Sequence, residues 1–375
     1  MTKDTLALFS FICLLSGPAC QAASFQEAAI FGPPQRLATG SEPSAVVAGD
    51  IDGDGRLDAV VANQGDGDLS LFRGDGQGRL VPIGRVACGD SPTGLALADV
   101  DEDGKLDVVV ANHETDYLTI LSGDGRGGFS PAPDSPLTIE VSPHPHEVRV
   151  ADLNQDGHPD LLVDHRDGEG LLVLPGAGKG RLQSPGQLIK TGGDPYRGME
   201  VADVNRDGKL DLLTPNPGNV GLVLGEDPAT LAFQPIRTVN AHRPFAIALG
   251  DLNGDGHLDL VTASEPSSPP GIFLGDGQGR FNEHPNALSS LPQGAKNIVT
   301  ADFNGDGFDD AAIANWSSSR ILLLLGGAQE IVENRLQAAP NPWGLSAADL
   351  NQDGRPDLLI TSNTESRLLV FLTGR

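Results

Sequence analysis

Basic residues are scarce in this chain of 375 residues, which has 25 Lys and Arg against 51 Asp and Glu. The resulting formal charge of −26 excludes a nucleic-acid-binding protein, because neutralising phosphates requires clustered basic residues. Hydrophobic residues make up 39% of the chain, too many for a disordered acidic protein. Beyond the N-terminus no apolar run is long enough to span a bilayer, so we expect no membrane insertion.

The N-terminal segment has the pattern of a secretory signal peptide. Leu6 to Leu15 form an apolar run (LALFSFICLL) that follows Lys3 and precedes a small-residue stretch ending at Ala23. We therefore expect residues 1–23 to be a cleaved signal peptide and the protein to be periplasmic or secreted. A buried N-terminal helix is the alternative interpretation of this run.

Cysteine is rare as well. The sequence has three, Cys13, Cys20 and Cys88, and signal cleavage would remove the first two. Lipid attachment at Cys20 is a minor alternative to cleavage after it. Since Cys88 would then have no cysteine to pair with, the exported chain needs a stabilising element other than a disulfide.

A nine-residue motif rich in Asp and Gly recurs seven times after this segment. Its copies begin at Asp50, Asp99, Asp152, Asp203, Asp251, Asp302 and Asp349, at intervals of 47 to 53 residues. Short apolar segments of strand length flank each copy, such as SAVVAG before Asp50 and those starting at Ala59 and Leu69. A Gly-rich turn and a variable fourth segment follow. Four strands per repeat form a propeller blade, so the sequence predicts an all-β, seven-bladed β-propeller of four-stranded blades over residues 24–375.

The two ends of the chain are predicted to close this ring. The last repeat stops at Arg375, just after its third apolar segment, and so lacks a fourth strand. The segment Ser24–Phe31 precedes the first repeat, and we expect it to supply that strand. Such pairing removes open strand edges that would otherwise template aggregation.

The acidic loops are predicted calcium sites. Side-chain oxygens recur at positions 1, 3, 5 and 9 of each loop, and position 6 is always Gly, which allows a sharp turn. Oxygen ligands without Cys or His favour calcium or magnesium, and a large, flexible set favours calcium. The unlike side chains at position 7 indicate that the backbone carbonyl is the ligand there. The predicted ligands, for up to seven ions, are Asp50, Asp52, Asp54, Arg56 and Asp58; Asp99, Asp101, Asp103, Lys105 and Asp107; Asp152, Asn154, Asp156, His158 and Asp160; Asp203, Asn205, Asp207, Lys209 and Asp211; Asp251, Asn253, Asp255, His257 and Asp259; Asp302, Asn304, Asp306, Phe308 and Asp310; Asp349, Asn351, Asp353, Arg355 and Asp357.

Charge repulsion gives these loops a need for metal. Without an ion each loop would hold three or four carboxylates within a few ångströms of one another. We therefore expect calcium to stabilise the fold in place of disulfides.

The repeat also resembles a known family. The loop DxDxDGxxD or DxNxDGxxD, with a turn such as GDGRGGF from Gly123 to Phe129, is similar to FG-GAP/VCBS repeats. That family includes the calcium-binding propeller of integrin α-subunits and bacterial VCBS proteins. The resemblance covers residues 25–375 and implies a calcium-binding propeller used for adhesion or recognition, although some members are polysaccharide-active enzymes. A literal FG-GAP sequence is absent, which places the chain nearer the bacterial branch.

One position of the predicted innermost strand varies strongly between repeats. Six residues before each loop stand Ser44, Thr93, His146, Arg197, Phe245, Lys296 and Trp343. The residue two further on is always apolar, from Val46 to Leu345, and is predicted to build the core. We expect the variable position to face the mouth of the channel, opposite the calcium loops. The predicted ligand-binding residues are His146, Arg197, Glu200, Phe245, Lys296 and Trp343.

Two alternatives remain for this set. These residues are either a recognition surface or merely solvated rim residues. A transition-metal site formed by His144 and His146 with His113 or His165 is a third, weaker interpretation.

The predicted function is an exported binding module for protein or carbohydrate, acting as a monomer. The alternative is a polysaccharide-active lyase or dehydratase that uses His146, Arg197, Glu200 and Lys296, and a purely structural surface protein is a third possibility. The sequence has no GxSxG, HExxH or paired-cysteine zinc motif. GxGxxG at Gly123 is followed by no helix and is read as a hairpin turn. We therefore assign no catalytic residue, and the binding module is favoured over the enzyme.

Overall fold

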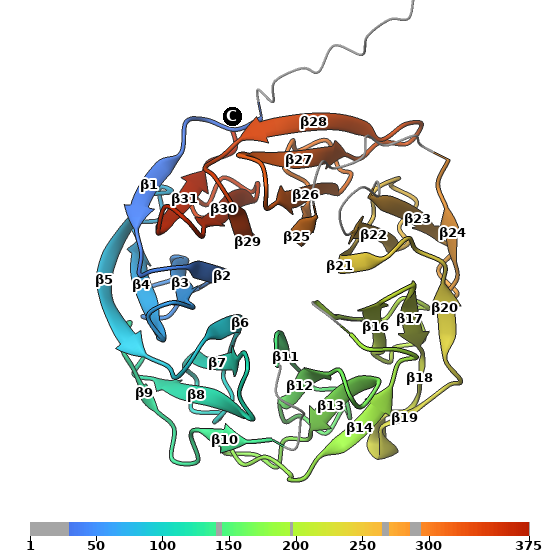
Figure 1. The fold of residues 1–375 in the computed structure, drawn as a ribbon, viewed down its shortest axis with the longest axis horizontal. Coiled ribbons are helices and arrows are strands. Elements are labelled where there is room, and N and C mark those ends of the chain that lie inside the picture. Colours follow the sequence, from blue (N-terminus) through green and yellow to red (C-terminus); the bar gives the residue numbers. More distant parts are fainter. Residues whose placement is uncertain (1–29, 140–144, 196–197, 265–269, 286–293, 375) are drawn as a thin grey trace, which may run out of the picture.

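Short antiparallel strands make up nearly all of the regular structure. The computed structural model describes residues 30–139, 145–195, 198–264, 270–285 and 294–374. Seven of the sheets are arranged in a ring, each with a path of four antiparallel neighbours (Figure 1). We number the sheets as blades 1 to 7 in chain order of their innermost strands. The predicted seven-bladed propeller is thus confirmed, while the predicted signal peptide lies outside the described residues.

Each blade runs outward from the central axis in chain order. The innermost strands are β2 (Pro43–Gly49), β6 (Pro92–Ala98), β11 (Val148–Ala151), β15 (Glu200–Ala202), β21 (Pro244–Gly250), β25 (Ala295–Ala301) and β29 (Pro342–Ala348). The second strands are β3 (Asp58–Asn63), β7 (Asp107–Asn112), β12 (Asp160–His165), β16 (Asp211–Asn216), β22 (Asp259–Ser264), β26 (Asp310–Asn315) and β30 (Asp357–Ser362). The third strands are β4 (Asp68–Gly74), β8 (Tyr117–Gly123), β13 (Gly170–Leu174), β17 (Asn219–Val223), β23 (Gly271–Gly275), β27 (Arg320–Leu325) and β31 (Arg367–Phe371).

The outer strands are the most irregular part of the ring. They are β5 (Leu80–Ala87), β10 (Leu137–Thr138) with β9 (Phe129–Pro131) beside it, β14 (Gln187–Lys190), β20 (Arg237–Val239), β24 (Phe281–Glu283), β28 (Val332–Gln337) and β1 (Gln35–Ala38). Blade 4 adds a small ribbon of β18 (Gly225–Asp227) and β19 (Ala232–Phe233), joined by the 3-10 turn η1 (Pro228–Thr230). Among the described residues, no helix has the length and apolar character needed to cross a bilayer.

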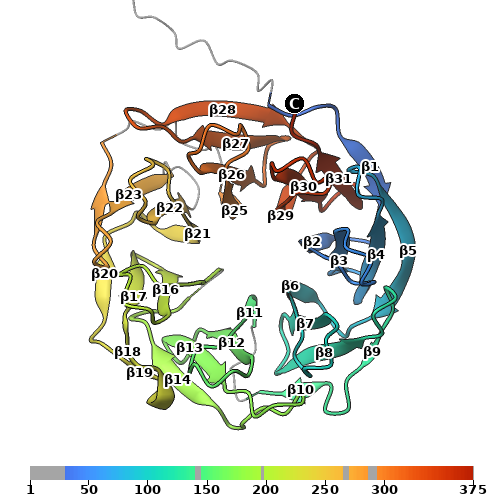
Figure 2. The ribbon, with the colours of Figure 1, turned by 180° about the vertical axis from the view of Figure 1, so that it is seen from behind.

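The ring closes through the two ends of the chain. β1 pairs with β31 in blade 7, so the first strand lies outside the last (Figure 2). Closure is confirmed, but the closing strand is β1 rather than the predicted Ser24–Phe31, of which residues 24–29 lie outside the described residues. Phe31 makes only an isolated bridge with Thr373, and Pro33 and Pro34 follow, which have no backbone N–H to donate to a ladder. Regular pairing therefore starts at Gln35.

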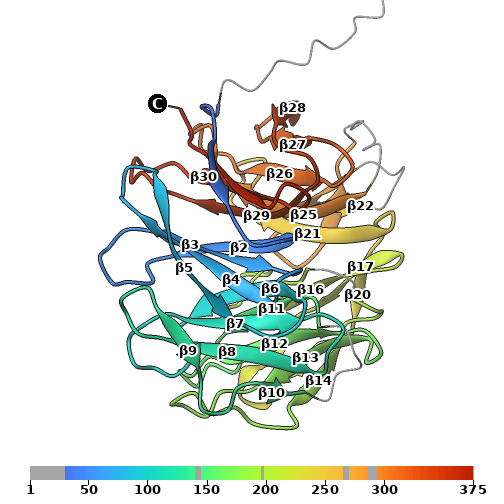
Figure 3. The ribbon, with the colours of Figure 1, turned by 60° about the vertical axis from the view of Figure 1, so that its left-hand side comes forward.

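The core is divided among the interfaces between blades. Each of seven buried apolar clusters lies between two neighbouring sheets, as where Val61 and Phe72 of blade 1 pack with Leu359 and Leu368 of blade 7. Blades 1 to 3 are seen lying one beside the next in Figure 3. The predicted core position is buried in every blade, with Val148 and Met199 fully so. Stability thus depends on contacts repeated around the ring.

Innermost strands approach each other too closely for side chains at certain points. A Cβ atom added to Gly344 would lie 2.8 Å from the Cα atom of Ala45 in blade 1. One added to Gly94 would lie 2.6 Å from the carbonyl oxygen of His146 in blade 3. Glycine at these positions allows neighbouring blades to meet near the axis.

Phe31 provides a test of closure. Its ring packs against Phe303 at 5.5 Å and Phe371 at 6.2 Å between centroids, and it is 9% exposed. We expect Phe31→Ala to lower the free energy of unfolding by about 3 kcal/mol, because a buried aromatic side chain is lost. Urea denaturation measures this change. The control Val332→Ala, at a residue 47% exposed, should leave the midpoint nearly unchanged, and equal midpoints for both variants would contradict a stabilising role for the closing segment.

Candidate functional site

The seven acidic loops lie on one face of the ring. Each connects the end of an innermost strand to the start of a second strand, and the position-9 Asp is the first residue of that second strand. The position-1 carboxylate accepts a hydrogen bond from the N–H of the position-6 Gly in all seven loops, at 2.7 to 3.0 Å. These glycines have φ between 80° and 92°, a left-handed conformation that explains the invariant residue.

The position-9 carboxylates are buried and doubly hydrogen-bonded. In the first loop, Asp58 accepts one bond from Ile51 N–H at 3.1 Å and another from Gly74 N–H at 2.7 Å. The other six loops repeat this arrangement, with the second donor always near the end of the third strand. Burial raises the pKa of Asp58 to about 6 and that of Asp310 to about 7, against the opposing effect of these bonds. Position 9 therefore joins three segments of its own blade.

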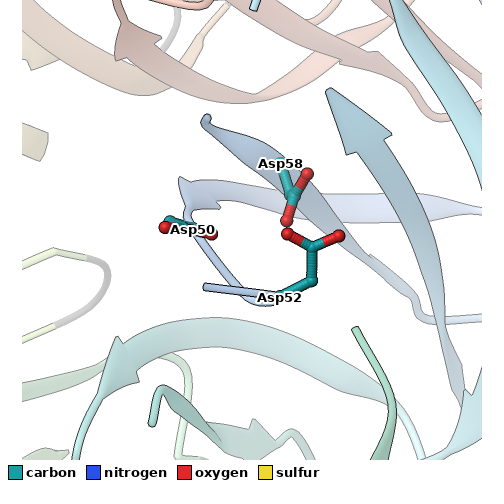
Figure 4. Close-up of side chains that lie close together, drawn as sticks. All are labelled: Asp50, Asp52 and Asp58. Atoms are coloured by element: carbon teal, nitrogen blue, oxygen red, sulfur yellow. The ribbon is translucent and has the colours of Figure 1, made fainter. Parts of the chain in front are cut away.

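Two of the loops bring three carboxylates together. Ligand atoms of Asp50, Asp52 and Asp58 lie within 4.8 Å of one another, and so do those of Asp99, Asp101 and Asp107. Figure 4 shows the carboxylates of Asp52 and Asp58 facing each other, with Asp50 to one side.

One oxygen in the first loop has the environment of a metal ligand. The Asp52 side chain is 9% exposed, and its Oδ2 atom lies 2.6 Å from Nε of Arg73. Its Oδ1 atom is buried and accepts no hydrogen bond within the described structure. A buried carboxylate oxygen without a donor is costly, and a cation among these three aspartates would relieve that cost. The residues present therefore fit a divalent ion.

Three of the side chains at position 7 interact with acidic residues. Arg56 and Lys105 form ion pairs with the position-5 carboxylates Asp54 and Asp103, and Arg56 lowers the pKa of Asp54. His158 Nδ1 lies 2.6 Å from Glu102 of the preceding loop, which raises the pKa of the imidazole. These three side chains therefore have acidic partners within the chain, and the role of the position-7 carbonyl stays a prediction.

Neighbouring loops are also linked to one another. Gln155 donates to the carbonyl of Gly208 at 2.7 Å, across the interface between blades 3 and 4. Gln352 donates to the carbonyl of Gly55 at 2.9 Å, which joins the last loop to the first. Both glutamines occupy position 4 of their loops. Two of the seven pairs of neighbouring loops are thus linked through position 4.

The central channel holds a polar cavity of about 360 Å³. Charged groups in its lining include Glu147, Arg149, Glu200 and Lys296. Arg149 pairs with Glu147, and burial raises the pKa of Glu200 to about 7 although the nearby Arg149 opposes the shift. The cavity therefore contains both signs of charge.

An aromatic cluster surrounds one of these charges at the mouth opposite the loops. The Lys296 ammonium lies 4.6 Å from the ring centroid of Phe245, 5.3 Å from Trp316 and 4.9 Å from Trp343. The two indoles meet edge to face, with centroids 6.1 Å apart. The four side chains come from blades 5, 6 and 7. We call this group the Trp–Lys cluster.

A second mouth-side group centres on His146. Its Nδ1 atom lies 3.2 Å from Oδ2 of Asp164, and its ring centroid is 4.5 Å from that of His113. Asp164 Oδ1 also accepts the N–H groups of His146 and Glu147. His146 is 3% exposed, so it is packed into the blade rather than presented to solvent.

The repeat itself matches a known protein family. A model of the FG-GAP-like repeat matches residues 50–110, 99–163, 203–262, 251–313 and 302–360. The chain belongs to the FG-GAP-like repeat family. A comparison with curated proteins found no match.

Solved structures resemble this FG-GAP-like chain in fold alone, given their low identity. BBS1N in complex with ARL6DN has a TM-score of 0.64 at 14% identity, covering 92% of this chain and 98% of its own. A lectin from Agrocybe aegerita, described as recognising non-reducing terminal N-acetylglucosamine, has a TM-score of 0.54 at 15% identity, covering 82% and 91%. A functionally unknown protein from Desulfotomaculum acetoxidans has a TM-score of 0.55 at 12% identity, covering 81% and 92%.

In this FG-GAP-like propeller the described members of the predicted mouth set fall into separate groups. Phe245, Lys296 and Trp343 come together, whereas His146 packs against Asp164 and Glu200 lies in the channel cavity. Arg197 and His144 lie outside the described residues. Ser44 and Thr93, at the same repeat position, are buried, and their hydroxyls donate to carbonyls of the next blade at 2.8 and 3.2 Å. Equal spacing in the sequence therefore does not give equal exposure.

Three contributors were absent from the predicted ligand set. Trp316 follows the second strand of blade 6, and its signal was the scarcity of tryptophan, of which the chain has 2. Arg149 lies in β11, three residues after His146, and Asp164 lies in β12, where nothing in the repeat marked it. In the described part of the chain, three or more metal-ligating side chains come together only in the two aspartate clusters. Neither cluster contains a histidine.

The role of position 9 can be tested at Asp310. Both of its oxygens accept backbone N–H groups, from Gly326 at 2.9 Å and from Phe303 at 3.1 Å. In chelator, where metal cannot contribute, we expect Asp310→Asn to lower the free energy of unfolding by about 3 kcal/mol, because an amide NH₂ group would face a backbone donor. Urea denaturation against the exposed control Asp194→Asn checks this, and indistinguishable midpoints would show that the double acceptor is dispensable.

Proposed function

We propose that this chain is an exported, calcium-stabilised propeller that serves as a recognition module for a protein or carbohydrate ligand. The ligand binds on the mouth face, opposite the acidic loops. One observation carries the proposal: Phe245, Lys296, Trp316 and Trp343 converge there from three blades. Aromatic side chains with a cation among them supply both contact area and charge complementarity, which are the properties of binding hot spots.

Calcium is the proposed stabilising ion on the opposite face. Support comes from the seven oxygen-rich loops, from the two aspartate clusters and from the donorless oxygen of Asp52. When bound, the ion supplies positive charge to carboxylates that otherwise repel one another. Hydrogen bonds within each loop, and those accepted by the position-9 aspartates, hold the ligand oxygens in place.

Export is consistent with this use of calcium. The signal-like segment before Ala23 directs the chain outside the cytoplasm, where calcium reaches the millimolar range that weak modules need. Cys88 is buried, and burial raises the pKa of its thiol to about 12, so the exported protein presents no reactive thiol there.

The enzyme alternative has weaker support. His146 with Asp164 is the pairing expected of a general base, yet His146 is 3% exposed and out of reach of a polymer substrate. Burial raises the pKa of Glu200 in the channel to about 7, but the cavity beside it measures about 360 Å³, a volume that suits a small molecule rather than a polysaccharide chain. Recognition without turnover is the better fit.

Calcium dependence provides the first test. At a calcium concentration about tenfold above the dissociation constant, each occupied loop should add about 1.4 kcal/mol to the free energy of unfolding. Excess chelator should therefore lower the melting temperature markedly, and equimolar magnesium should restore less of it. Equilibrium dialysis of Asp52→Ala should find one ion fewer than in the control Asp194→Ala. A melting temperature unaffected by chelator would contradict the proposal.

Blocking one face provides the second test. Because Cys88 is buried, a cysteine placed at exposed Ser317, beside Trp316, can be labelled selectively with a polyethylene-glycol maleimide. We expect this label to abolish binding of glycans or proteins that the unlabelled protein captures on arrays with calcium present. The same label at Val332→Cys, on the outer strand β28, should leave binding intact. Loss of binding with both labels, release of cleaved glycan, or no capture by the unlabelled protein would each argue against a mouth-face recognition module.

A further inference from the structure

The Trp–Lys cluster concentrates a rare residue type at one place. Aromatic residues make up 5% of the chain, and both of its tryptophans lie in this cluster. They reach it from different blades, Trp316 from the loop after β26 and Trp343 from β29. Packing within one blade therefore does not account for their meeting.

Trp316 is exposed to a degree that packing does not require. It is 41% exposed, and the other exposed large hydrophobic residues of the described chain are aliphatic: Val81, Ile83, Leu188, Ile236 and Val332. An indole left open to solvent keeps a flat apolar face available, which is how aromatic side chains serve at binding surfaces.

Lys296 adds a defined charge beside this face. Its ammonium is held over three rings at 4.6 to 5.3 Å, so its position is constrained by packing rather than left to a flexible side chain. The same residue lines the channel cavity of about 360 Å³, which lies next to the cluster. A ligand at the mouth thus meets an apolar plane and a fixed positive charge side by side, in a protein whose formal charge is −26.

We propose that the Trp–Lys cluster is a subsite for an acidic sugar residue of the hexuronate type. The C–H face of the pyranose ring stacks on the indole of Trp316, and the ring carboxylate pairs with the Lys296 ammonium. This inference rests on the proposed function and names the ligand class that the mouth face takes.

Other ligand classes match the cluster less well. A cationic ligand would be repelled by the ammonium that already lies over the three rings. A neutral sugar would stack on the indole but form no ion pair with the ammonium. An acidic peptide would use the charge, but its carboxylates stand on flexible chains with no flat face to stack, and ordering those chains costs free energy.

The tryptophans themselves report on the site. Since the chain has 2 tryptophans and both lie in the cluster, intrinsic fluorescence of the mature protein responds to this site directly. Titrations at fixed free calcium and fixed ionic strength should use three probes: trigalacturonate, its fully methyl-esterified form and a tetraglutamate peptide. The ester keeps the rings and removes the charge. We expect trigalacturonate to change the fluorescence and to bind about tenfold more tightly than the ester or the peptide.

Variants separate the two contacts. Lys296→Met should weaken trigalacturonate about tenfold and leave the ester unaffected, while Lys296→Arg should restore most of the affinity. Trp316→Ala should weaken both sugars, with Trp343 remaining as the reporter. Val332→Ala, away from the mouth, is the matched control. Circular dichroism and the chelator-sensitive melting temperature establish that each variant is folded.

The outcomes distinguish the subsite from the general function. No fluorescence change at trigalacturonate concentrations up to about 10 mM, with array ligands still captured at the mouth, would overturn the subsite and leave the recognition module standing. Equal affinity for acid and ester, equal affinity for the peptide, or unchanged binding by Lys296→Met would also overturn it. Failure of mouth-face binding with every array ligand would overturn both.

Discussion

The double hydrogen bond of the position-9 aspartate is the interaction on which the rest of this propeller depends. A carboxylate buried in the blade is tolerated because both of its oxygens accept backbone N–H groups. One donor lies in the loop and the other near the end of the third strand, so a single side chain fixes the acidic loop against its sheet. The oxygens at positions 1 and 3 are then held around a shared space, as in the cluster of Asp50 and Asp52 with Asp58. Calcium would use an arrangement that the backbone already imposes.

Hydrogen bonds between neighbouring loops connect these local arrangements across blade interfaces. The position-4 residues Gln155 and Gln352 donate to carbonyls of the following loop, and the second of these bonds joins blade 7 to blade 1. The closing strand β1 joins the same two blades at the rim. The chain ends thus meet through both a loop contact and a strand pair. Opening the ring between blades 7 and 1 must therefore break the Gln352 hydrogen bond near the loops and the pairing of β1 at the rim.

Sequence reasoning succeeded where a rule applies to every repeat. The period and the invariant glycines predicted seven blades, and the burial of Val148 and Met199 follows from that frame. Sequence reasoning failed where a side chain's partner or a strand's bounds depend on a segment further along the chain. The second partner of Asp58 lies 16 residues further along the chain, so the dual role of position 9 could not be inferred from the loop alone. Likewise Pro33 and Pro34 moved the closing strand to Gln35–Ala38, although the sequence indicated that some N-terminal strand must close the ring.

The two faces of the ring differ because different residues are free to vary on them. On the loop face every blade must keep its aspartates and glycines. On the mouth face the start of the innermost strand differs between blades: Ser44 and Thr93 are small and donate to a carbonyl of the next blade, His146 packs against Asp164, and Lys296 and Trp343 meet in the Trp–Lys cluster. In blades 1 and 2 the hydroxyl joins neighbouring blades, and in blade 6 Lys296 contacts Phe245 of blade 5 and Trp343 of blade 7. The asymmetry of the mouth, with the Trp–Lys cluster on blades 5 to 7, thus arises from the variable position of the innermost strand together with Trp316 in the loop after β26.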